Sequence, residues 1–255
     1  MIKKIVVLIS AIMFTCVTYC NAGESIVIAT SNYAPFTSSE NNGSGVILDV
    51  VEKAFQNVNI DVEYQFYPWK RCEYLVEQGK AFAATPYFKT DQRMDKYDFS
   101  VPIVKSFNRF FYNKEKFPDG YEWETLKDFK GYTMGGILGL WYMPKFKKAG
   151  LKIHTAGTDL QNLKMLIAKR IDFTVIDELT GKKVLNDLKP GDAKKIGILD
   201  KPESVSDFYL MVSRDYKNHS ELNEKFTKGF KMLKESGEYM KILSQYQLPE
   251  HFAVR

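Results

Sequence analysis

The chain has 255 residues, with 36 lysines and arginines against 31 aspartates and glutamates, which gives a formal net charge of +5 at pH 7. Basic and acidic residues are interspersed without a basic block, so the composition gives little support to nucleic-acid binding. Three cysteines in a chain of this length exclude a disulfide-rich fold and leave room for one or two buried apolar cores.

Residues 1–22 are typical of a cleavable secretory signal. A basic start, MIKK, precedes an apolar run at 5–17 that is too short to span a bilayer comfortably, and small residues follow near Ala22. Cys16 and Cys20 make a lipoprotein signal an alternative, although a small residue is expected just before such a cysteine, and a retained anchor is a third reading. Cleavage would export a soluble protein with one cysteine, which must be held together by its core.

Segments typical of strands and helices alternate through the first half of the chain. A buried strand is predicted at 25–30, and alternating apolar and polar residues predict a half-covered strand at 60–66. Between them, residues 47–58 place apolar side chains three and four positions apart, as in an amphipathic helix. A second helix at 71–79 leads to a short strand at 81–85. This repeated βαβ order predicts a parallel sheet with helices on its faces.

The second half continues the same order. Strands are predicted at 132–137, 152–155, 172–176, 195–199 and 207–213. A helix at 158–170 is opened by Thr158 or Asp159, and two further helices, at 220–237 and 237–247, close the chain. Two α/β units of similar size account for this pattern, and periodicity does not decide whether they are consecutive or interleaved.

Arg93 lies where local helix physics favours an acid. Thr90 is typical of an N-cap, and a capping box would then place Glu or Gln at the third helical position. A cation at that position also opposes the positive end of the helix dipole. An ion pair with Asp95 or Asp98 would explain the arginine structurally, and contact with an anionic ligand would explain it functionally. Spacing alone favours the ion pair.

Seven motifs in a fixed order resemble the periplasmic solute-binding proteins of the amino-acid ABC-transporter type, the bacterial extracellular solute-binding proteins of family 3. They are NYAPF, a Gly-Asp helix entry, GKAFAAT, KTDQRMDKYDFSVP, LKDFKGYTMGGILG, AKRIDFTVID and KESGEYMKILSQY. The resemblance implies an α/β two-lobe clamshell of the type 2 periplasmic-binding fold, with two crossovers between the lobes. Residues 23–104 and 207–255 would form lobe 1, residues 105–206 would form lobe 2, and the lobes would close on a solute by hinge motion.

The resemblance also implies two charged anchors. Arg93 occupies the position that grips the ligand's carboxylate, to which a planar guanidinium fork is well suited. Asp177, at the end of the strand DFTVID, occupies the position that accepts the ligand's ammonium group, although it would also suit an N-cap of the helix that Glu178 starts. Asp172, in the same strand, reads as structural.

The walls of the implied site are aromatic. Tyr33, Trp69 and Tyr87 match or lie near wall positions, although burial in the core is the default role of such residues. The chain departs from the family at Phe88 and at Trp141, where amino-acid binders usually have hydroxyl groups. Thr85 is a candidate replacement for one of them. These departures favour an aromatic, cyclic or modified solute, or a peptide-like one, as much as a plain α-amino acid.

The expected function is capture of a small zwitterionic or anionic solute in the periplasm for the membrane permease of an ABC transporter. We expect a monomer without catalysis, cofactor or metal, since the three histidines are scattered and the common nucleophile and phosphate motifs are absent. Two alternatives remain. One is a periplasmic cyclohexadienyl dehydratase-like enzyme that uses a carboxylate such as Asp177 or Glu178 as general acid. The other is a ligand-sensing protein that acts through a receptor.

Overall fold

The computed structural model describes residues 24–40, 43–137 and 140–254, so the predicted signal segment at 1–22 lies outside the described residues. The strands are β1 (Glu24–Thr30), β2 (Ile60–Phe66), β3 (Ala83–Tyr87), β4 (Asp98–Phe99), β5 (Val104–Asn113), β6 (Thr133–Ile137), β7 (Lys152–Ala156), β8 (Phe173–Asp177), β9 (Ile196–Ile198) and β10 (Ser204–Val212). The helices are α1 (Val46–Gln56), α2 (Trp69–Glu77), α3 (Asp91–Met94), α4 (Met143–Lys148), α5 (Asp159–Ile167), α6 (Glu178–Asn186), α7 (Pro190–Ala193), α8 (His219–Glu235) and α9 (Glu238–Gln245). In the described part of the chain, 3-10 turns also occur at Leu126–Phe129 and at Glu250–Phe252.

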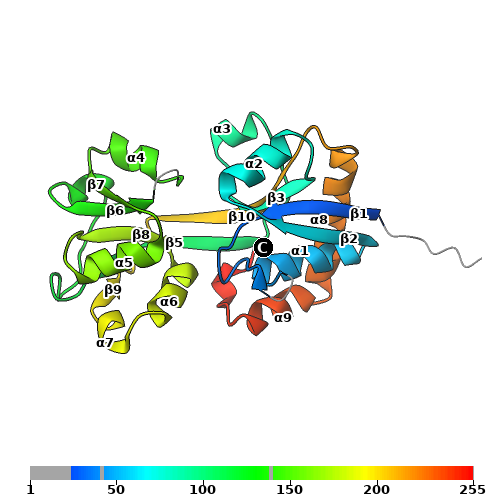
Figure 1. Ribbon diagram of the computed structural model, residues 1–255. Helices are drawn as coiled ribbons and strands as arrows, with labels where there is room; N and C mark the ends of the chain where they lie inside the picture. Colours follow the sequence, from blue (N-terminus) through cyan, green and yellow to red (C-terminus); the bar gives the residue numbers. More distant parts are fainter. Residues whose placement is uncertain (1–23, 41–42, 138–139, 255) are drawn as a thin grey trace, which may run out of the picture.

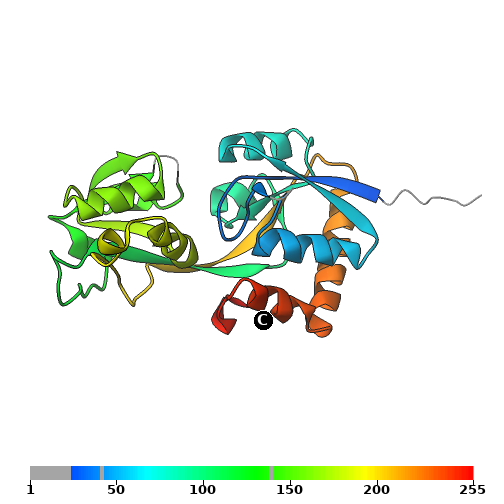
Figure 2. The same cartoon turned by 60° about the horizontal axis from the view of Figure 1, so that its bottom comes forward.

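The elements form two lobes joined by two long strands (Figure 1). The first lobe contains β1 to β4 with α1, α2, α3, α8 and α9, and the second contains β6 to β9 with α4 to α7. β5 and β10 pair with each other in antiparallel fashion and run from one lobe to the other, as Figure 2 shows. The strand order is β2-β1-β3-β10-β5-β8-β6-β7, so the joining strands lie in the middle of the path. We propose to divide the lobes within these two strands, at 104/105 and 206/207.

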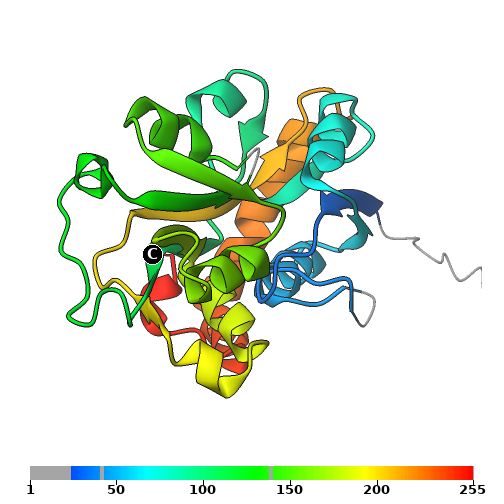
Figure 3. The ribbon, with the colours of Figure 1, turned by 60° about the vertical axis from the view of Figure 1, so that its left-hand side comes forward.

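Each lobe has the parallel strands that the βαβ order predicts. β1 pairs in parallel with β2 and β3, and β6 pairs in parallel with β7 and β8. In the second lobe, α4 covers one face of these strands, while α5 and α6 cover the other (Figures 1 and 3). The carboxyl ends of parallel strands meet at one edge of a sheet, which is where open α/β sheets bind ligands.

Each lobe also has its own apolar core. The main core of the first lobe joins α1, α8 and α9 to the sheet, and the core of the second gathers around Phe110, Phe129 and Phe173. The helices of the first lobe pack closely because Gly229 of α8 has no side chain: a Cβ there would lie 1.9 Å from the carbonyl oxygen of Ala54 in α1. The apolar side chains of each lobe are thus packed mainly within that lobe.

Candidate functional site

A cavity of about 470 Å³ lies between the lobes. Arg93, Trp69 and Tyr87 line it from the first lobe, Asp177 and Trp141 from the second, and Asn108 and Phe208 from the joining strands. The volume is within the range of small-molecule sites, roughly 300–1,000 Å³. Walls from both lobes mean that a change in the angle between them would open or close the cavity.

Arg93 lines this cavity, and its side chain is held by contacts within its own lobe. Thr90 caps α3, with its hydroxyl accepting a hydrogen bond from the Arg93 amide. In the side chain, Nη2 donates to Glu73 Oε1 at 2.8 Å and Nη1 donates to the carbonyl oxygen of Phe88 at 3.2 Å. The guanidinium carbon lies 4.7 Å from the ring centre of Tyr87. Arg93 is therefore oriented before any solute arrives.

Arg93 does not form the ion pair with Asp98 that its spacing in the sequence suggested, because Asp98 pairs with other residues. Asp98 accepts from Arg214 Nε at 2.9 Å and lies 3.6 Å from His219 Nε2. The ion-pair partner of Arg93 is Glu73, on α2. The sequence did not single out Glu73, because it lies 20 residues away and looks like an ordinary polar residue on a helix surface.

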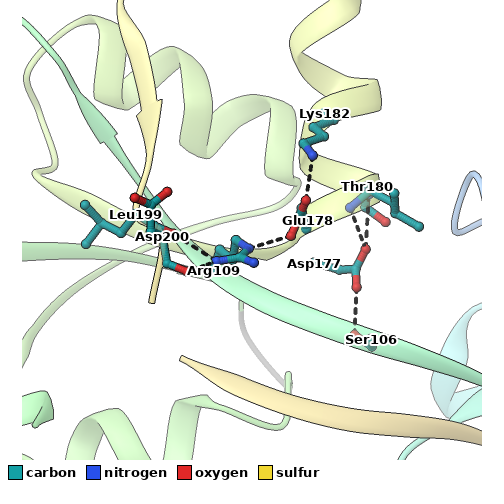
Figure 4. Close-up of polar contacts among 9 residues, drawn as sticks. Ser106, Arg109, Asp177, Glu178, Thr180, Lys182, Leu199 and Asp200 are labelled. Atoms are coloured by element: carbon teal, nitrogen blue, oxygen red, sulfur yellow. Dashed lines mark hydrogen bonds and ion pairs between the residues drawn. The ribbon is translucent and has the colours of Figure 1, made fainter. Parts of the chain in front are cut away.

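Asp177 both caps α6 and lines the cavity. Its Oδ1 accepts from the amides of Leu179 and Thr180 at 3.0 and 3.2 Å, and its Oδ2 accepts from the Ser106 hydroxyl at 2.7 Å (Figure 4). The residue is 1% exposed, and this burial raises its pKa to about 6 although the three hydrogen bonds oppose the shift. Asp177 is thus the N-cap of α6, and the same carboxylate lines the cavity.

Glu178 lies on the other side of the same helix start. Arg109 Nε and Lys182 Nζ each donate to it at 2.5 Å, and Figure 4 shows its carboxylate turned toward these two cations rather than toward Ser106. Burial acts to raise its pKa, but the hydrogen bonds from Lys182 and Arg109 outweigh burial and lower it. An acid held ionised in this way is poorly suited to donate a proton.

The walls of the cavity are largely aromatic. Tyr33, Trp69, Tyr87 and Trp141, the aromatic residues singled out in the sequence, line it, and Phe88, Tyr142 and Phe208 join them. The rings support one another: Trp69 meets Tyr87 edge-on at 5.5 Å, and Phe88 stacks on Phe208 at 4.6 Å. Among the described residues that line the cavity, none is a serine or a threonine.

Thr85 does not supply the missing hydroxyl. It is fully buried in β3, and its Oγ1 donates to the carbonyl oxygen of Tyr209 in β10 at 3.3 Å. Its own carbonyl oxygen accepts from the Thr30 hydroxyl at 2.7 Å. Thr85 therefore belongs to the sheet and not to the cavity lining, because strand register, which the sequence does not reveal, places its hydroxyl against β10.

Asp159 is a cavity residue that the sequence showed only as a helix start. It follows the N-cap Thr158 as the first residue of α5 and lines the cavity near Asp177. Burial raises its pKa to about 6, and the negative charge of Asp177 adds to the shift. An acid in a first helical turn normally needs no further explanation, so no signal in the sequence set it apart.

The two lobes touch directly beside the cavity. Thr180 Oγ1 in α6 donates to the carbonyl oxygen of Ala34 in the first lobe at 3.1 Å. Leu179 packs against the core of the first lobe, and Phe88 meets Trp141 edge-on at 5.7 Å. These contacts cross the cleft and can form only when the lobes are close together.

Within the described residues, no helix is long and apolar enough to cross a membrane. The same part of the chain holds no group of three or more histidine, cysteine, aspartate or glutamate side chains arranged to bind a metal ion.

Residues 26–249 match the bacterial extracellular solute-binding proteins, family 3. The chain belongs to this family. No curated protein sequence matches this solute-binding protein significantly. Its fold is the two-lobe α/β clamshell of type 2 periplasmic-binding proteins, as comparison with solved structures shows.

Three such structures illustrate the range of proteins with this fold. An amino-acid ABC transporter substrate-binding protein from Streptococcus pneumoniae, bound to L-arginine, is 20% identical with a TM-score of 0.69, over 87% of this chain and 93% of that one. An ancestral amino-acid-binding protein, a precursor of cyclohexadienyl dehydratase, is 17% identical with a TM-score of 0.70, over 87% and 94%. A histidine kinase sensor domain is 16% identical with a TM-score of 0.75, over 88% and 96%.

Proposed function

We propose that this protein captures a small solute with a carboxylate and an ammonium group by closing its lobes, and delivers it to the permease of an ABC transporter. The observation that carries the proposal is the cavity between the lobes, with Arg93 on one side and Asp177 on the other. The substrate-binding protein from Streptococcus pneumoniae has the same fold and serves such a transporter.

Arg93 is the proposed carboxylate anchor. A guanidinium has five N–H donors, and the contacts to Glu73 and Phe88 use two of them. Three donors remain for a solute carboxylate, and guanidinium groups commonly bind carboxylates in bidentate fashion. Because Glu73 and Tyr87 already fix the side chain, little rotamer entropy is lost when the solute binds.

Asp177 is the proposed ammonium anchor. Burial desolvates its carboxylate and raises its pKa, so a cationic group of the solute would restore the stabilisation that water gives elsewhere. The aromatic walls suit an apolar or aromatic body between the two charged ends. Tyr33, Trp69, Tyr87 and Trp141 are the proposed wall contacts.

Closure is proposed to seal the solute from water. Thr180 and Leu179 on α6 reach the first lobe when the cleft is shut, and Asp177 begins the same helix. A solute that draws Asp177 inward therefore also brings these contacts together. Cleavage of the expected signal at 1–22 would place the mature protein in the periplasm, where the permease is accessible. We propose that it acts there as a monomer.

A dehydratase-like enzyme is the second candidate, and the raised pKa values of Asp177 and Asp159 in an aromatic cavity favour it. A carboxyl group with a pKa near 6 can act as a general acid at neutral pH, a role for which Glu178 is poorly placed. Incubation with prephenate or arogenate tests this candidate. Turnover that Asp177→Asn abolishes would establish an enzyme, whereas no turnover by the wild-type protein would leave solute binding as the function.

A sensor is the third candidate. In that case a receptor, instead of a permease, would bind the closed form of the two lobes.

Thermal-shift screening against amino acids, aromatic acids and short peptides tests the proposed function, because a solute that binds only the folded state raises the melting temperature. Arg93→Ala should weaken binding of the best solute by about 2–5 kcal/mol, roughly 30- to 5,000-fold in Kd. Arg71→Ala is the matched control, since Arg71 lies on α2 outside the cavity lining. Unchanged affinity in Arg93→Ala would remove Arg93 as the anchor.

A further inference from the structure

The charged side chains that line the cavity do not balance. Among the described residues they are Lys70, Glu73, Arg93, Asp159 and Asp177. Lys70 is exposed at the rim, and the 2.8 Å ion pair with Glu73 neutralises Arg93. The charges that remain inside are both negative and both belong to the second lobe.

Asp159 and Asp177 lie at the same edge of the second lobe. β6 pairs in parallel with β7 and with β8, and Ile137 at the end of β6 lies opposite Ala156 at the end of β7. Asp177 is the last residue of β8, and Asp159 opens α5 just after β7. The topology therefore brings two carboxylates from separate helix starts into one cavity.

The two carboxylates differ in their partners. Asp177 accepts three hydrogen bonds, whereas no hydrogen bond or ion pair joins the Asp159 side chain to another residue in the described part of the chain. Neighbouring carboxylates in a desolvated site repel each other, and a cation placed beside them removes the repulsion. A neutral solute would instead seal Asp159 from water without giving it a partner.

Aromatic side chains line the same cavity as this carboxylate. Trp141 and Tyr142 line the cavity on the same lobe and meet edge-on at 5.6 Å. Tyr33 approaches from the first lobe: burial raises its pKa, and the charges of Asp177 and Asp159 add to the shift. Rings of this kind attract cations over their faces, and tryptophan does so most strongly.

We propose that the solute carries a second cationic group, which Asp159 accepts beside the aromatic wall of Trp141 and Tyr142. The solute is then an amino acid with a basic side chain and a net positive charge. This inference rests on the proposed function, because it assigns Arg93 and Asp177 to the solute's carboxylate and first ammonium group. Asp159 becomes the residue that separates basic from neutral solutes.

Two pairs of near-isosteric probes test the inference by calorimetry: L-arginine against L-citrulline, and L-lysine against L-norleucine. The basic member of at least one pair should bind about tenfold or more tightly than its neutral partner, as expected for a buried charge pair. Asp159→Asn should reduce that preference to about threefold or less, with its fold checked by thermal unfolding. Asp187→Asn, an exposed acid on the same lobe, should leave it unchanged.

The inference is wrong if the neutral probes bind as tightly as the basic ones, if Asp159→Asn keeps the preference, or if none of the four probes binds. The comparison within the wild-type protein needs no variant, so a folding defect cannot hide the answer. The proposed function fails separately: it is lost only if the wider panel of neutral, acidic and aromatic solutes also gives no binding.

Discussion

The guanidinium of Arg93 and the carboxylate of Glu73 form a 2.8 Å ion pair at the wall of the cavity, with the Arg93 and Glu73 side chains 26% and 35% exposed. The pair holds Arg93 against Tyr87 and gives it a negative neighbour before a solute arrives. Glu73 thus acts as a positioning residue and also lowers the positive charge that the solute meets.

Glu73→Gln separates these two effects. Glutamine keeps an oxygen that can accept from Arg93 Nη2, but it removes the negative charge that would repel a solute carboxylate. We expect binding of a carboxylate-bearing solute to tighten by about 3- to 10-fold, because a like charge next to the anchor disfavours the ionised ligand. Calorimetry with wild type and variant measures this. Unchanged or weaker binding in Glu73→Gln would contradict the charge effect assigned to Glu73.

Asp177→Asn should not destabilise the ligand-free protein at pH 8. The carboxyl pKa is raised from 3.8 to about 6 on folding, so its ionised form opposes folding. Its contribution to the free energy of unfolding is fully present below the pKa of the unfolded state, and it is lost as the pH rises through the higher pKa of the folded state. Asparagine also caps helices well. We expect the variant to be about 1–3 kcal/mol more stable at pH 8 and equal to wild type below about pH 4.

Chemical denaturation at both pH values measures this difference. Asp177→Ala is the informative comparison, because it removes the cap together with the charge and should be about 1–2 kcal/mol less stable than Asp177→Asn. A loss of stability in Asp177→Asn at pH 8 as large as that in Asp177→Ala would show that the charge itself holds α6 in place.

Thr180→Val should weaken solute binding without changing the cavity wall. Valine preserves the shape of the side chain and removes the hydrogen bond to the Ala34 carbonyl oxygen. The closed form then loses about 0.5–1.5 kcal/mol, and affinity falls by roughly 2- to 10-fold because binding is coupled to closure. Calorimetry and small-angle scattering follow affinity and closure together.

Thr227→Val is the control for this substitution. Its hydroxyl donates to the Asn223 carbonyl oxygen within α8, on the surface of the first lobe away from the cleft. The control should bind solute like wild type. Equal affinities in Thr180→Val and wild type would remove the Thr180 contact from the closing mechanism.

The periodic elements of the fold could be predicted from the sequence, and the joining strand β5 could not. Helices such as α1 bury residues three and four apart, so their pattern is local. β5 carries Lys105, Asn108 and Arg109 among its apolar residues because it crosses the cleft between two cores. Burial alternates along the first half of β5, but Ser106 and Asn108 occupy buried positions and Phe107 a half-buried one, so the sequence shows no apolar alternation.

The site was predictable only where a residue's position in a motif fixes its place in space. Asp177 ends β8, Arg93 lies in the short helix α3 after β3, and both line the cavity. Thr85 was misplaced because side-chain direction within a buried strand depends on register. Glu73 and Asp159 were overlooked because each looks ordinary in its local sequence. Only the packing of helices around the cavity places Glu73 beside Arg93 and leaves Asp159 without a hydrogen-bond partner among the described residues.

The most direct test of the account compares one bound amino acid with its decarboxylated amine and its deaminated acid, by calorimetry on wild type, Arg93→Ala and Asp177→Asn. The affinity lost on removing the carboxylate should largely vanish in Arg93→Ala, and the affinity lost on removing the ammonium group should largely vanish in Asp177→Asn. If both losses are as large in the variants as in wild type, the two side chains do not hold the solute and the account is contradicted.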